Sequence, residues 1–388
     1  MRSVSVIGIG ETKMGKREGL TMKDLIREAG EAAIVDAGID KAAIQAVYVG
    51  NFNGSYLCGQ SQVGPMVTEV LGLPRIPSMR TEGACASGSL SFRQAMIAIA
   101  AGIYDVVLVG GVEKMTHQPT EIITSAIASA EDVGLEVAAG ITFPSLFAMI
   151  ANRYFCEYRN VREEMALCAV SNHYNASLNP DAQLRKIITP EMVKNGVPVA
   201  SPFTVYDCSL VSDGAAFVVL AASDIARALN NGHRQVEIAG SGHGGDVISL
   251  CGKESLTTFH ATKCAAREAY QQAGVTAADI QFAEVHDCFT ITQIINIEDL
   301  GFFPKGHGAD AVAEGKIAIT GEKPINTSGG LKAKGHPIGA TGLSQIFEVV
   351  TQLRGDAGER QLRRADLGLT HNLGGAAGTC LVHVFRGL

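Results

Sequence analysis

The sequence contains no tryptophan and is poor in charged and aromatic side chains. Charged residues make up 18% of its 388 residues and aromatic residues 6%, whereas about 25% of the residues of a typical soluble protein are charged. The formal net charge is −7, so the chain lacks the general excess of lysine and arginine that binds nucleic-acid phosphates. We therefore expect no nucleic-acid partner, and we expect much surface to be covered by packed layers or by a second subunit.

Long hydrophobic runs are also absent. The longest wholly apolar run in the most hydrophobic region extends from Ala95 to Tyr104, which is only half of the ~20 residues that a membrane-spanning helix requires. Residues 1–8 show a strand-and-turn pattern rather than the charged, apolar and small-residue regions of a signal peptide. The sequence predicts a cytoplasmic protein that does not enter a membrane.

The nine cysteines are odd in number and include no Cys-x-x-Cys pair. Disulfide frameworks require paired cysteines, and zinc clips use closely spaced pairs. The sequence therefore predicts neither a disulfide framework nor a zinc clip. Any special cysteine is expected to act as a reactive group.

Glycine is abundant, with 44 residues. At ~150 residues per domain the length corresponds to two or three ordinary domains or one large one. Short β-branched runs alternate with alanine-rich helical runs, a pattern typical of α/β proteins whose parallel sheets are flanked by helices. The expected strands are 4–9, 46–51, 105–110, 235–239, 282–286, 368–372 and 379–385, and the expected helices are 23–37, 90–101, 261–273 and 342–353.

The two halves share an internal repeat. Residues 37–45 (AGIDKAAIQ) match residues 273–281 (AGVTAADIQ) at five of nine positions. Any helix that ends at a glycine would produce part of this match. Between the halves, over residues 117–205, the alternation breaks and aromatic, charged and proline residues become denser. The sequence predicts two similar halves and a mostly helical insertion, where binding surface is often carried.

The segment 82–90 reads EGACASGSL and leads from a strand into an apolar helix. A cysteine at the start of a helix is close to free N–H groups and to the positive end of the helix dipole, which lowers its pKa. Cys85 is therefore a candidate nucleophile with a lowered pKa. The alternative is a small buried hydrophobic residue, which is the commonest state of an unpaired cysteine.

The segment 284–290 reads EVHDCFT and closes a predicted strand of the second half. The carboxyl ends of strands are where α/β proteins bind ligands. His286 and Cys288 share one face of the strand and Asp287 points to the other. A catalytic loop, a structural turn and a metal site all fit these residues.

Two glycine-rich loops follow. Residues 326–342 read NTSGGLKAKGHPIGATG but match neither the phosphate-binding loop nor the dinucleotide fingerprint. His336 in this loop is suited to take a proton from a thiol. Residues 371–378 read HNLGGAAG, and such glycines let backbone N–H groups approach a ligand oxygen closely.

Together with GGVEKM at 110–115, these four segments resemble the thiolase superfamily. The HDCF sequence at 286–289, and SPFTVYDCS at 201–209, resemble the sterol-carrier-protein type of thiolase. The resemblance implies a five-layered α-β-α-β-α fold with two similar halves and an inserted loop domain. It implies an N-terminal half at 1–116 completed by 206–232, a loop domain at 117–205 and a C-terminal half at 233–388.

The resemblance also implies an acyl-CoA C-acyltransferase that cleaves a 3-ketoacyl-CoA with coenzyme A, or runs the reverse Claisen condensation. It implies that Cys85 is the acylated nucleophile and His336 its base. With a water held by His286, His336 lines the oxyanion hole for the thioester oxygen. Ordinary thiolases have a second cysteine where this chain has Asn372, and the resemblance implies that Cys288 replaces it as the acid/base. The amides of Cys85 and Gly374 form the second oxyanion hole.

The binding residues are less specific. The resemblance places Ser209 at the pantetheine arm, and it places Phe147 and Met149 near the acyl chain, although helix packing also accounts for these two. The cations expected for the phosphates of coenzyme A are Arg159, Arg162, Arg185 and Lys186.

The resemblance further implies a homodimer or a dimer of dimers, and some relatives have a small zinc-containing OB-fold partner subunit. The end at Leu388 predicts no appended sterol-carrier domain, and residues 386–388 are not a convincing peroxisomal signal. A non-thiolytic condensing enzyme and an inactive scaffold that binds coenzyme A stay open as alternatives.

Overall fold

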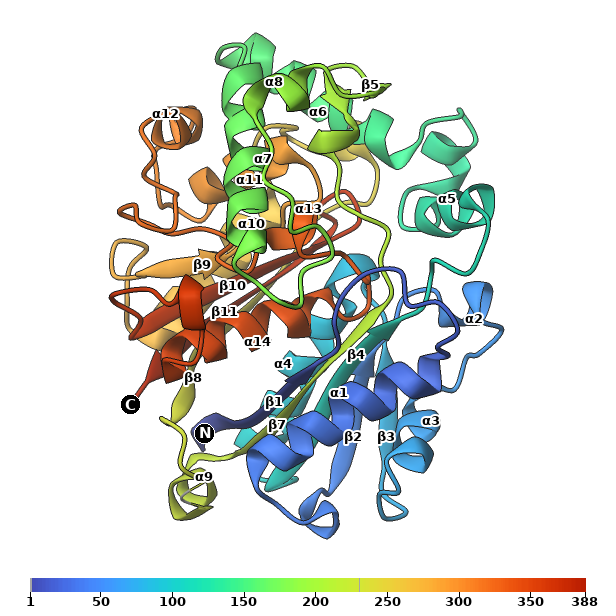
Figure 1. Ribbon diagram of the computed structural model, residues 1–388, viewed down its shortest axis with the longest axis vertical. Coiled ribbons are helices and arrows are strands. Elements are labelled where there is room, and N and C mark those ends of the chain that lie inside the picture. Colours follow the sequence, from blue (N-terminus) through green and yellow to red (C-terminus); the bar gives the residue numbers. More distant parts are fainter. Residues whose placement is uncertain (1, 230) are drawn as a thin grey trace.

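The computed structural model describes residues 2–229 and 231–388 (Figure 1). Met1 and Asn230, which fall within the predicted halves, lie outside the described residues. Strands and helices alternate along both halves, as the sequence predicts for an α/β protein.

The N-terminal half is a sheet with helices on both faces. Its elements are β1 (Val4–Glu11), α1 (Met22–Ala37), β2 (Ala46–Gly50), α2 (Gly54–Leu57), α3 (Val63–Val70), β3 (Ser78–Thr81), α4 (Ser87–Ala100), β4 (Val106–Glu113), β7 (Gly214–Ala222) and α9 (Ser223–Leu229). The strand order is β1, β7, β4, β2, β3. Helices α1 and α3 pack on the outer face of this sheet and α4 on the inner face.

The C-terminal half repeats this arrangement. Its elements are β8 (Val236–Gly245), α10 (His260–Ala273), β9 (Phe282–Glu284), α11 (Thr290–Asp299), α12 (Gly308–Ala313), α13 (Gly330–Ala333), α14 (Thr341–Arg354), β10 (Leu367–Gly374) and β11 (Thr379–Gly387). The strand order is β8, β11, β10, β9, and a parallel bridge joins Ala283 of β9 to Ile325. In both halves the first strand pairs with the last, so the predicted similarity of the halves is confirmed.

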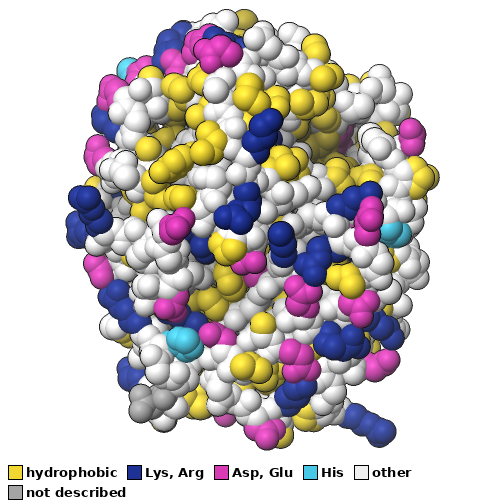
Figure 2. Space-filling view, in the orientation of Figure 1, with side chains coloured by type: hydrophobic (Ala, Val, Ile, Leu, Met, Phe, Trp, Pro, Cys, Tyr) yellow, Lys and Arg dark blue, Asp and Glu magenta, His cyan; other side chains and the backbone are white. Residues whose placement is uncertain are grey.

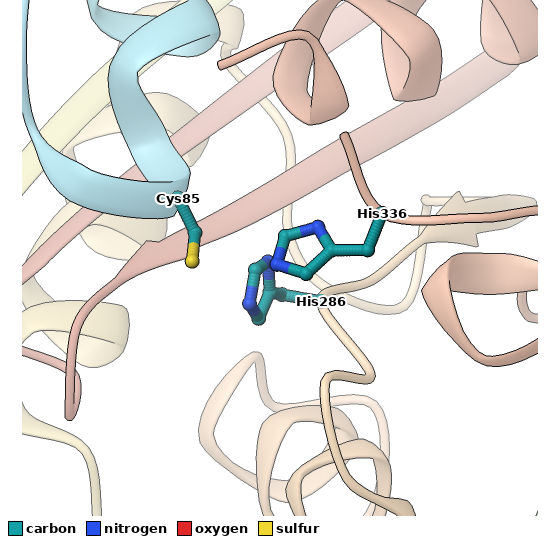
Figure 3. Close-up of side chains that lie close together, drawn as sticks. All are labelled: Cys85, His286 and His336. Carbon is teal, nitrogen blue, oxygen red and sulfur yellow. The ribbon is translucent and has the colours of Figure 1, made fainter. Parts of the chain in front are cut away.

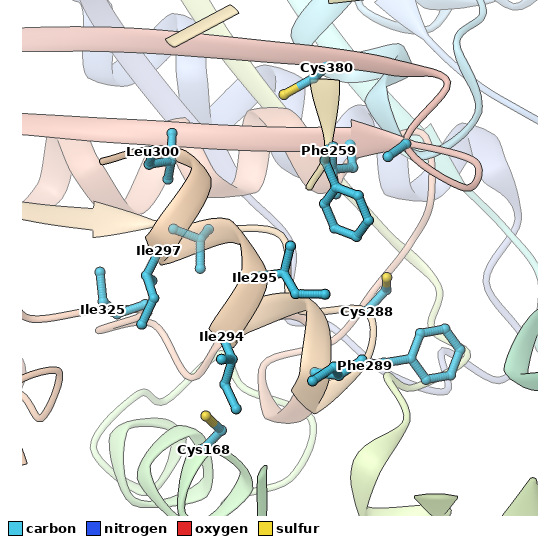
Figure 4. Close-up of a cluster of buried hydrophobic side chains, with 14 of the residues drawn as sticks. Cys168, Phe259, Cys288, Phe289, Ile294, Ile295, Ile297, Leu300, Ile325 and Cys380 are labelled. Atoms are coloured by element: carbon cyan, nitrogen blue, oxygen red, sulfur yellow. The ribbon is translucent and has the colours of Figure 1, made fainter. Parts of the chain in front are cut away.

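Helices α4 and α14 form the middle layer. Phe92 of α4 and Leu343 of α14 share one buried cluster with Val218 of β7 and Phe385 of β11. The outer helices α10 and α11 cover the far face of the C-terminal half, where the core includes the thiols Cys168 and Cys380 (Figure 4). The layers therefore run α-β-α-β-α, as expected. The two halves also join edge to edge, because β1 and β8 pair through residues such as Val6 and Val236.

The sheets are mixed, so the expectation of parallel sheets was wrong in part. β7 runs antiparallel to β1 and β4, and β11 runs antiparallel to β8 and β10. Residues 375–378 join β10 directly to β11, and a connection this short allows only an antiparallel pair. The pairs of β2 with β3 and β4, and of β9 with β10, are parallel.

The internal repeat marks equivalent helix ends. Gly38 ends α1 with φ 65° and ψ 31°, and Gly274 ends α10 with φ 65° and ψ 35°. Both residues occupy the left-handed region, which costs glycine little because it has no Cβ. The shared glycine therefore has the same structural role in each half.

The segment between the halves is mostly helical. It contains α5 (Thr120–Ala128), α6 (Phe143–Glu157), α7 (Arg162–Ser177), α8 (Pro190–Lys194), β5 (Pro198–Ala200) and β6 (Phe203–Thr204). Single turns occur at Lys41–Ala43, Ala84–Ala86, Val133–Val137, Val205–Asp207, Leu250–Gly252 and Gly358–Arg360. Figure 2 shows hydrophobic side chains gathered over the upper part of one face, where this segment lies. Its exposed apolar residues include Ile187, Val197 and Val199.

None of the helices in the described ranges is both long enough and apolar enough to cross a membrane. The division into residues 1–116 with 206–232, 117–205 and 233–388 stays a prediction.

Candidate active site

Cys85 lies in a tight turn between β3 and α4. Ala84 before it has φ 49°, in the left-handed region that non-glycine residues rarely adopt. The Ser87 hydroxyl stabilises the turn, because it accepts the Gly83 N–H at 3.0 Å and donates to the Ala84 carbonyl oxygen at 2.6 Å. The turn places the thiol at the N-terminal end of α4, where Cys85 is only 5% exposed.

Burial raises the pKa of the Cys85 thiol to about 12. The amides of Gly375 and of Cys85 itself donate toward the sulfur and act in the opposite direction, but burial outweighs them. The expectation that the helix start lowers this pKa was therefore wrong. At neutral pH the thiol is protonated and requires a base to become a nucleophile.

His336 is held in its loop by two hydroxyl groups. Its backbone N–H donates to the Ser212 hydroxyl at 2.9 Å, and its Nδ1 lies 2.6 Å from the Thr341 hydroxyl. The Thr341 hydroxyl donates its proton to the Pro337 carbonyl oxygen at 3.1 Å, so it accepts from Nδ1–H. Burial lowers the pKa of His336 to about 3, so the ring is neutral and its Nε2 carries a free lone pair.

His286 follows the end of β9, which stops at Glu284 rather than at His286 as expected. Its Nδ1 lies 3.1 Å from the side-chain nitrogen of Asn372, a residue of β10. Its backbone N–H donates to His371 Nδ1 at 3.3 Å, and its carbonyl oxygen accepts from Asn296 at 2.7 Å. Burial, and the nearby His336 and His371, lower the pKa of His286 well below its usual value.

These three side chains converge (Figure 3). The Cys85 sulfur and one ring nitrogen each of His286 and His336 all lie within 4.8 Å of one another. They come from separate parts of the chain: the start of α4, the loop after β9 and the loop before α14. A thiol and two neutral imidazoles form a nucleophile with groups able to accept and donate protons.

Cys288 borders the same site. It is 3% exposed, and burial together with the closeness of Cys85 raises its pKa well above the usual value. Its sulfur lies 3.9 Å from the Thr292 hydroxyl. Asp287 does not line the cavity next to these thiols and accepts the Leu331 N–H at 2.7 Å. Because β9 ends at Glu284, the alternation of a strand is not the cause.

A cavity of about 310 Å³ lies beside these groups. Cys85, Cys288, His336 and Ser209 line it, so four predicted site residues face one space. The Ser209 N–H donates to the Cys288 carbonyl oxygen at 2.8 Å, which joins the segment at Ser209 to the loop that carries Cys288. The other lining residues are mainly apolar: Met115, Thr124, Ile127, Thr142, Phe143, Pro144, Cys208, Leu210, Val211, Phe289 and Ile338.

The two residues predicted to bind the acyl chain do not line this cavity. Phe147 is fully buried and stacks on Phe289, with ring centroids 4.7 Å apart. Met149 lies on the same helix and is 42% exposed. Phe147 therefore packs behind a cavity residue, which agrees with the helix-packing alternative.

The four predicted cations also lie outside the cavity lining. Arg159 forms ion pairs with Glu164 and Asp310, and Arg162 forms a bidentate ion pair with the buried Asp207. Arg185 and Lys186 are exposed. Arg159 and Arg162 therefore have carboxylate partners within the protein, whereas Arg185 and Lys186 lie at the surface.

Gly374 is where the C-terminal loop approaches the nucleophile turn. A Cβ on Gly374 would clash with the Gly83 carbonyl oxygen, so this approach requires glycine. The next amide, that of Gly375, donates toward the Cys85 sulfur. The oxyanion hole expected at the Gly374 amide stays a prediction.

Sequence reasoning missed three residues that hold the site together. Thr341 contacts the His336 ring, and Asn372 contacts the His286 ring. Glu113, inside the GGVEKM motif, is buried, and burial raises its pKa to about 7. It accepts the backbone N–H groups of Phe52 and Gly339 at 2.8 and 3.0 Å. The position of Glu113 in a motif was the only signal for it, because its partners lie far away in the sequence.

Comparisons with known proteins agree with this geometry. Residues 4–200 match the family model described as "Thiolase, N-terminal domain", and residues 242–387 match "Thiolase C-terminal domain-like". An acetyl-CoA acetyltransferase of Methanothermobacter thermautotrophicus is 46% identical, over 99% of this chain and 100% of that protein. Human sterol carrier protein 2 is 33% identical, over 100% of this chain and 72% of that protein.

Two solved structures have a similar fold. A complex named Ltp2-ChsH2(DUF35) aldolase superposes with a TM-score of 0.84 at 25% identity, covering 99% of this chain and 98% of that one. An acetyl-CoA acetyltransferase from Syntrophomonas wolfei superposes with a TM-score of 0.75 at 21% identity, covering all of both chains.

Proposed function

The chain belongs to the thiolase family, and from this membership we propose that it is an acyl-CoA C-acyltransferase working through an acyl-Cys85 intermediate. It cleaves a 3-ketoacyl-CoA with coenzyme A, or performs the reverse Claisen condensation. The observation that carries the proposal is the convergence of Cys85, His286 and His336, at a cavity that Cys85, His336 and Cys288 line. Thiolases use coenzyme A as a co-substrate and need no metal.

The first step makes the nucleophile. The Nε2 lone pair of His336 takes the Cys85 proton, and the thiolate attacks the 3-keto carbon. Because burial disfavours both the thiolate and the imidazolium, proton transfer accompanies attack rather than preceding it. The product of this step is a tetrahedral alkoxide bonded to the Cys85 sulfur. It becomes the acyl-Cys85 thioester, whose reactivity matches that of the substrate thioester, when the bond to the α-carbon breaks in the second step.

The second step breaks the bond between the α-carbon and the keto carbon. The departing fragment leaves as an enolate whose oxygen faces a donor on His286, acting through a water, and the imidazolium of His336. Cys288 gives its proton to the α-carbon, a role that suits a thiol whose burial keeps it protonated. Cys288 then takes the thiol proton of incoming coenzyme A, and the coenzyme A thiolate attacks the acyl-Cys85 thioester. The acyl group passes to coenzyme A, and the Cys85 thiolate that leaves takes back the proton held by His336.

The backbone stabilises the acyl-enzyme. The amides of Cys85 and Gly374 donate to the carbonyl oxygen of the acyl-enzyme, and Gly375 holds the sulfur. Ser209 contacts the pantetheine arm from the cavity wall. Arg185 and Lys186 are the cations for the phosphates of coenzyme A, since Arg159 and Arg162 already have carboxylate partners.

The proposal also includes an oligomeric assembly. We propose a homodimer or dimer of dimers in the cytoplasm that binds a small partner subunit. The exposed apolar residues of the helical segment support a covered surface. The complex of Ltp2 with ChsH2(DUF35) supports a small partner.

The test is intact-protein and peptide mass spectrometry after incubation with a panel of acyl-CoAs and 3-ketoacyl-CoAs. An acyl mass on Cys85, discharged by coenzyme A, is expected. A condensing enzyme would form the adduct but not release its acyl group to coenzyme A. Binding of coenzyme A without an adduct would indicate a scaffold.

A further inference from the structure

We propose that Asn372 is a positioning residue that fixes the ring proton of His286 on Nε2, so that this nitrogen faces the reacting atoms as a donor. The inference rests on the proposed function. It assigns a role to the residue that stands where ordinary thiolases have their second cysteine.

The hydrogen bond between the two side chains carries the inference. The nitrogen of an asparagine amide has only donor capacity, so at 3.1 Å it requires a lone pair on His286 Nδ1. A neutral imidazole carries one proton, which must then be on Nε2. Asn372 is fully buried, so water does not compete for this contact. Within the described ranges, the side-chain contact of the His286 ring is made through Nδ1. A ring nitrogen of His286 lies within 4.8 Å of the Cys85 sulfur, where substrate or water would bind.

The backbone of His286 is held independently of Asn372. Its N–H donates to His371 and its carbonyl oxygen accepts from Asn296. Loss of the Asn372 amide therefore changes the ring proton of His286 without releasing the loop. This independence separates a positioning role from a purely structural one.

The neighbouring ring has the opposite arrangement. Thr341 accepts the Nδ1 proton of His336 and leaves Nε2 as an acceptor. One ring thus offers a base to Cys85, and the other offers a donor to the enolate oxygen. If both rings had the same tautomer, the site would lack one of these two functions.

Two substitutions at position 372 test the assignment. Asn372→Leu keeps the branched shape of the side chain and removes the donor. Asn372→Asp keeps the shape and replaces the donor with an acceptor, which pulls the neutral ring's proton onto Nδ1. In the aspartate variant only the doubly protonated ring carries a proton on Nε2, so donation returns as the pH falls. Asn152→Asp on α6, where the amide contacts backbone carbonyls, is the control.

The readouts are acylation of Cys85 by acetyl-CoA and formation or cleavage of the carbon–carbon bond. We expect Cys85 acylation within about twofold of wild type in each variant, and carbon–carbon chemistry about 10- to 100-fold lower in both Asn372 variants at pH 8. Lowering the pH should restore Asn372→Asp but not Asn372→Leu. The control should behave as wild type throughout.

Other outcomes overturn the inference. Full carbon–carbon activity in Asn372→Leu would do so, and so would a loss equal at every pH in both variants. Nitrogen-15 NMR of the wild-type ring showing the proton on Nδ1 would also reject it. If wild-type Cys85 is not acylated at all, the proposed function fails first, and the two failures are therefore distinguishable.

Discussion

The imidazole rings of His286 and His336 meet edge to face, with ring centroids 5.4 Å apart and planes at 83°. In this arrangement a charge on one ring disfavours a charge on the other, and His336 contributes to the lowered pKa of His286. Both rings are therefore neutral at rest. In the proposed mechanism the site therefore passes one proton at a time, from Cys85 to His336 and from Cys288 to carbon.

The neutral resting state predicts a characteristic pH dependence for Cys85 alkylation. Because burial raises the pKa of this thiol to about 12, the thiolate fraction is small at pH 7 and rises about tenfold per pH unit. We expect the rate of modification by iodoacetamide, followed by peptide mass spectrometry without substrate, to increase steadily from pH 7 to pH 10. A plateau near pH 8 would show a low-pKa thiolate instead.

Cys288→Ala should separate the two halves of the reaction. Acyl transfer from acetyl-CoA to Cys85 uses Cys288 only to protonate the departing coenzyme A thiolate. Water or the His336 imidazolium can also protonate this good leaving group, so acylation continues at a moderately reduced rate. Carbon–carbon cleavage should fall by about 100-fold or more, because the enolate lacks its proton donor. Mass spectrometry of samples quenched at set times measures acylation of Cys85, and a thiolysis assay measures carbon–carbon cleavage.

Cys156→Ala is the matched control, because Cys156 is an exposed thiol outside the cavity lining. It should leave both steps unchanged. Full thiolysis by Cys288→Ala would remove Cys288 from the mechanism.

The fold was predictable from local patterns. The alternation of strands and helices reflects the conformational preferences of short segments. Gly38 and Gly274 each end a helix for the same local reason. The antiparallel direction of β7 was not predictable in this way, because it depends on how the chain returns after the helical segment 117–205. The direction of a strand depends on its connections, which its own residues do not encode.

The candidate site residues could be predicted where their reactive side chains lie in a sequence motif. Cys85, Cys288 and His336 lie in such motifs and face one cavity. The lowered pKa expected for Cys85 was wrong because burial depends on tertiary packing, which a helix start does not reveal. The contact of Asn372 with His286 spans 86 positions of sequence, so no local pattern signals it.

Thr341→Val should weaken the base rather than the fold. Valine keeps the shape of threonine but has no oxygen to accept the His336 Nδ1 proton, so the ring loses its preference for Nε2 as the acceptor. We expect Cys85 acylation to slow about 10-fold, with the thermal midpoint changing little. Thr341→Ser, which keeps the hydroxyl, should restore most of the rate. An unchanged rate in the valine variant would show that Nε2 needs no help from Thr341.

The surface cations and the paired arginines should respond differently to mutation. Arg162→Ala leaves the buried Asp207 without its bidentate partner, which should lower the free energy of unfolding by about 2–4 kcal/mol. Arg185→Ala and Lys186→Ala should leave stability unchanged and raise the KM for coenzyme A severalfold. Denaturant unfolding and steady-state kinetics distinguish the two effects. A raised KM with unchanged stability in Arg162→Ala would reverse this assignment.

Glu113→Gln should loosen the loop that carries His336. The carboxylate accepts two backbone N–H groups on one oxygen, from Phe52 and Gly339, and on the other it accepts the Asn53 N–H and the Asn51 side chain. A glutamine oxygen can replace only one of these oxygens, and its amide then points donors at the remaining N–H groups. An unsatisfied buried donor costs about 1–3 kcal/mol, so we expect the free energy of unfolding to fall by about 2–4 kcal/mol. Because Gly339 lies three residues after His336, Cys85 acylation should fall as well. Glu69→Gln, at an exposed ion pair on α3, should change neither quantity, and equal behaviour of the two variants would show that Glu113 does not hold the loop.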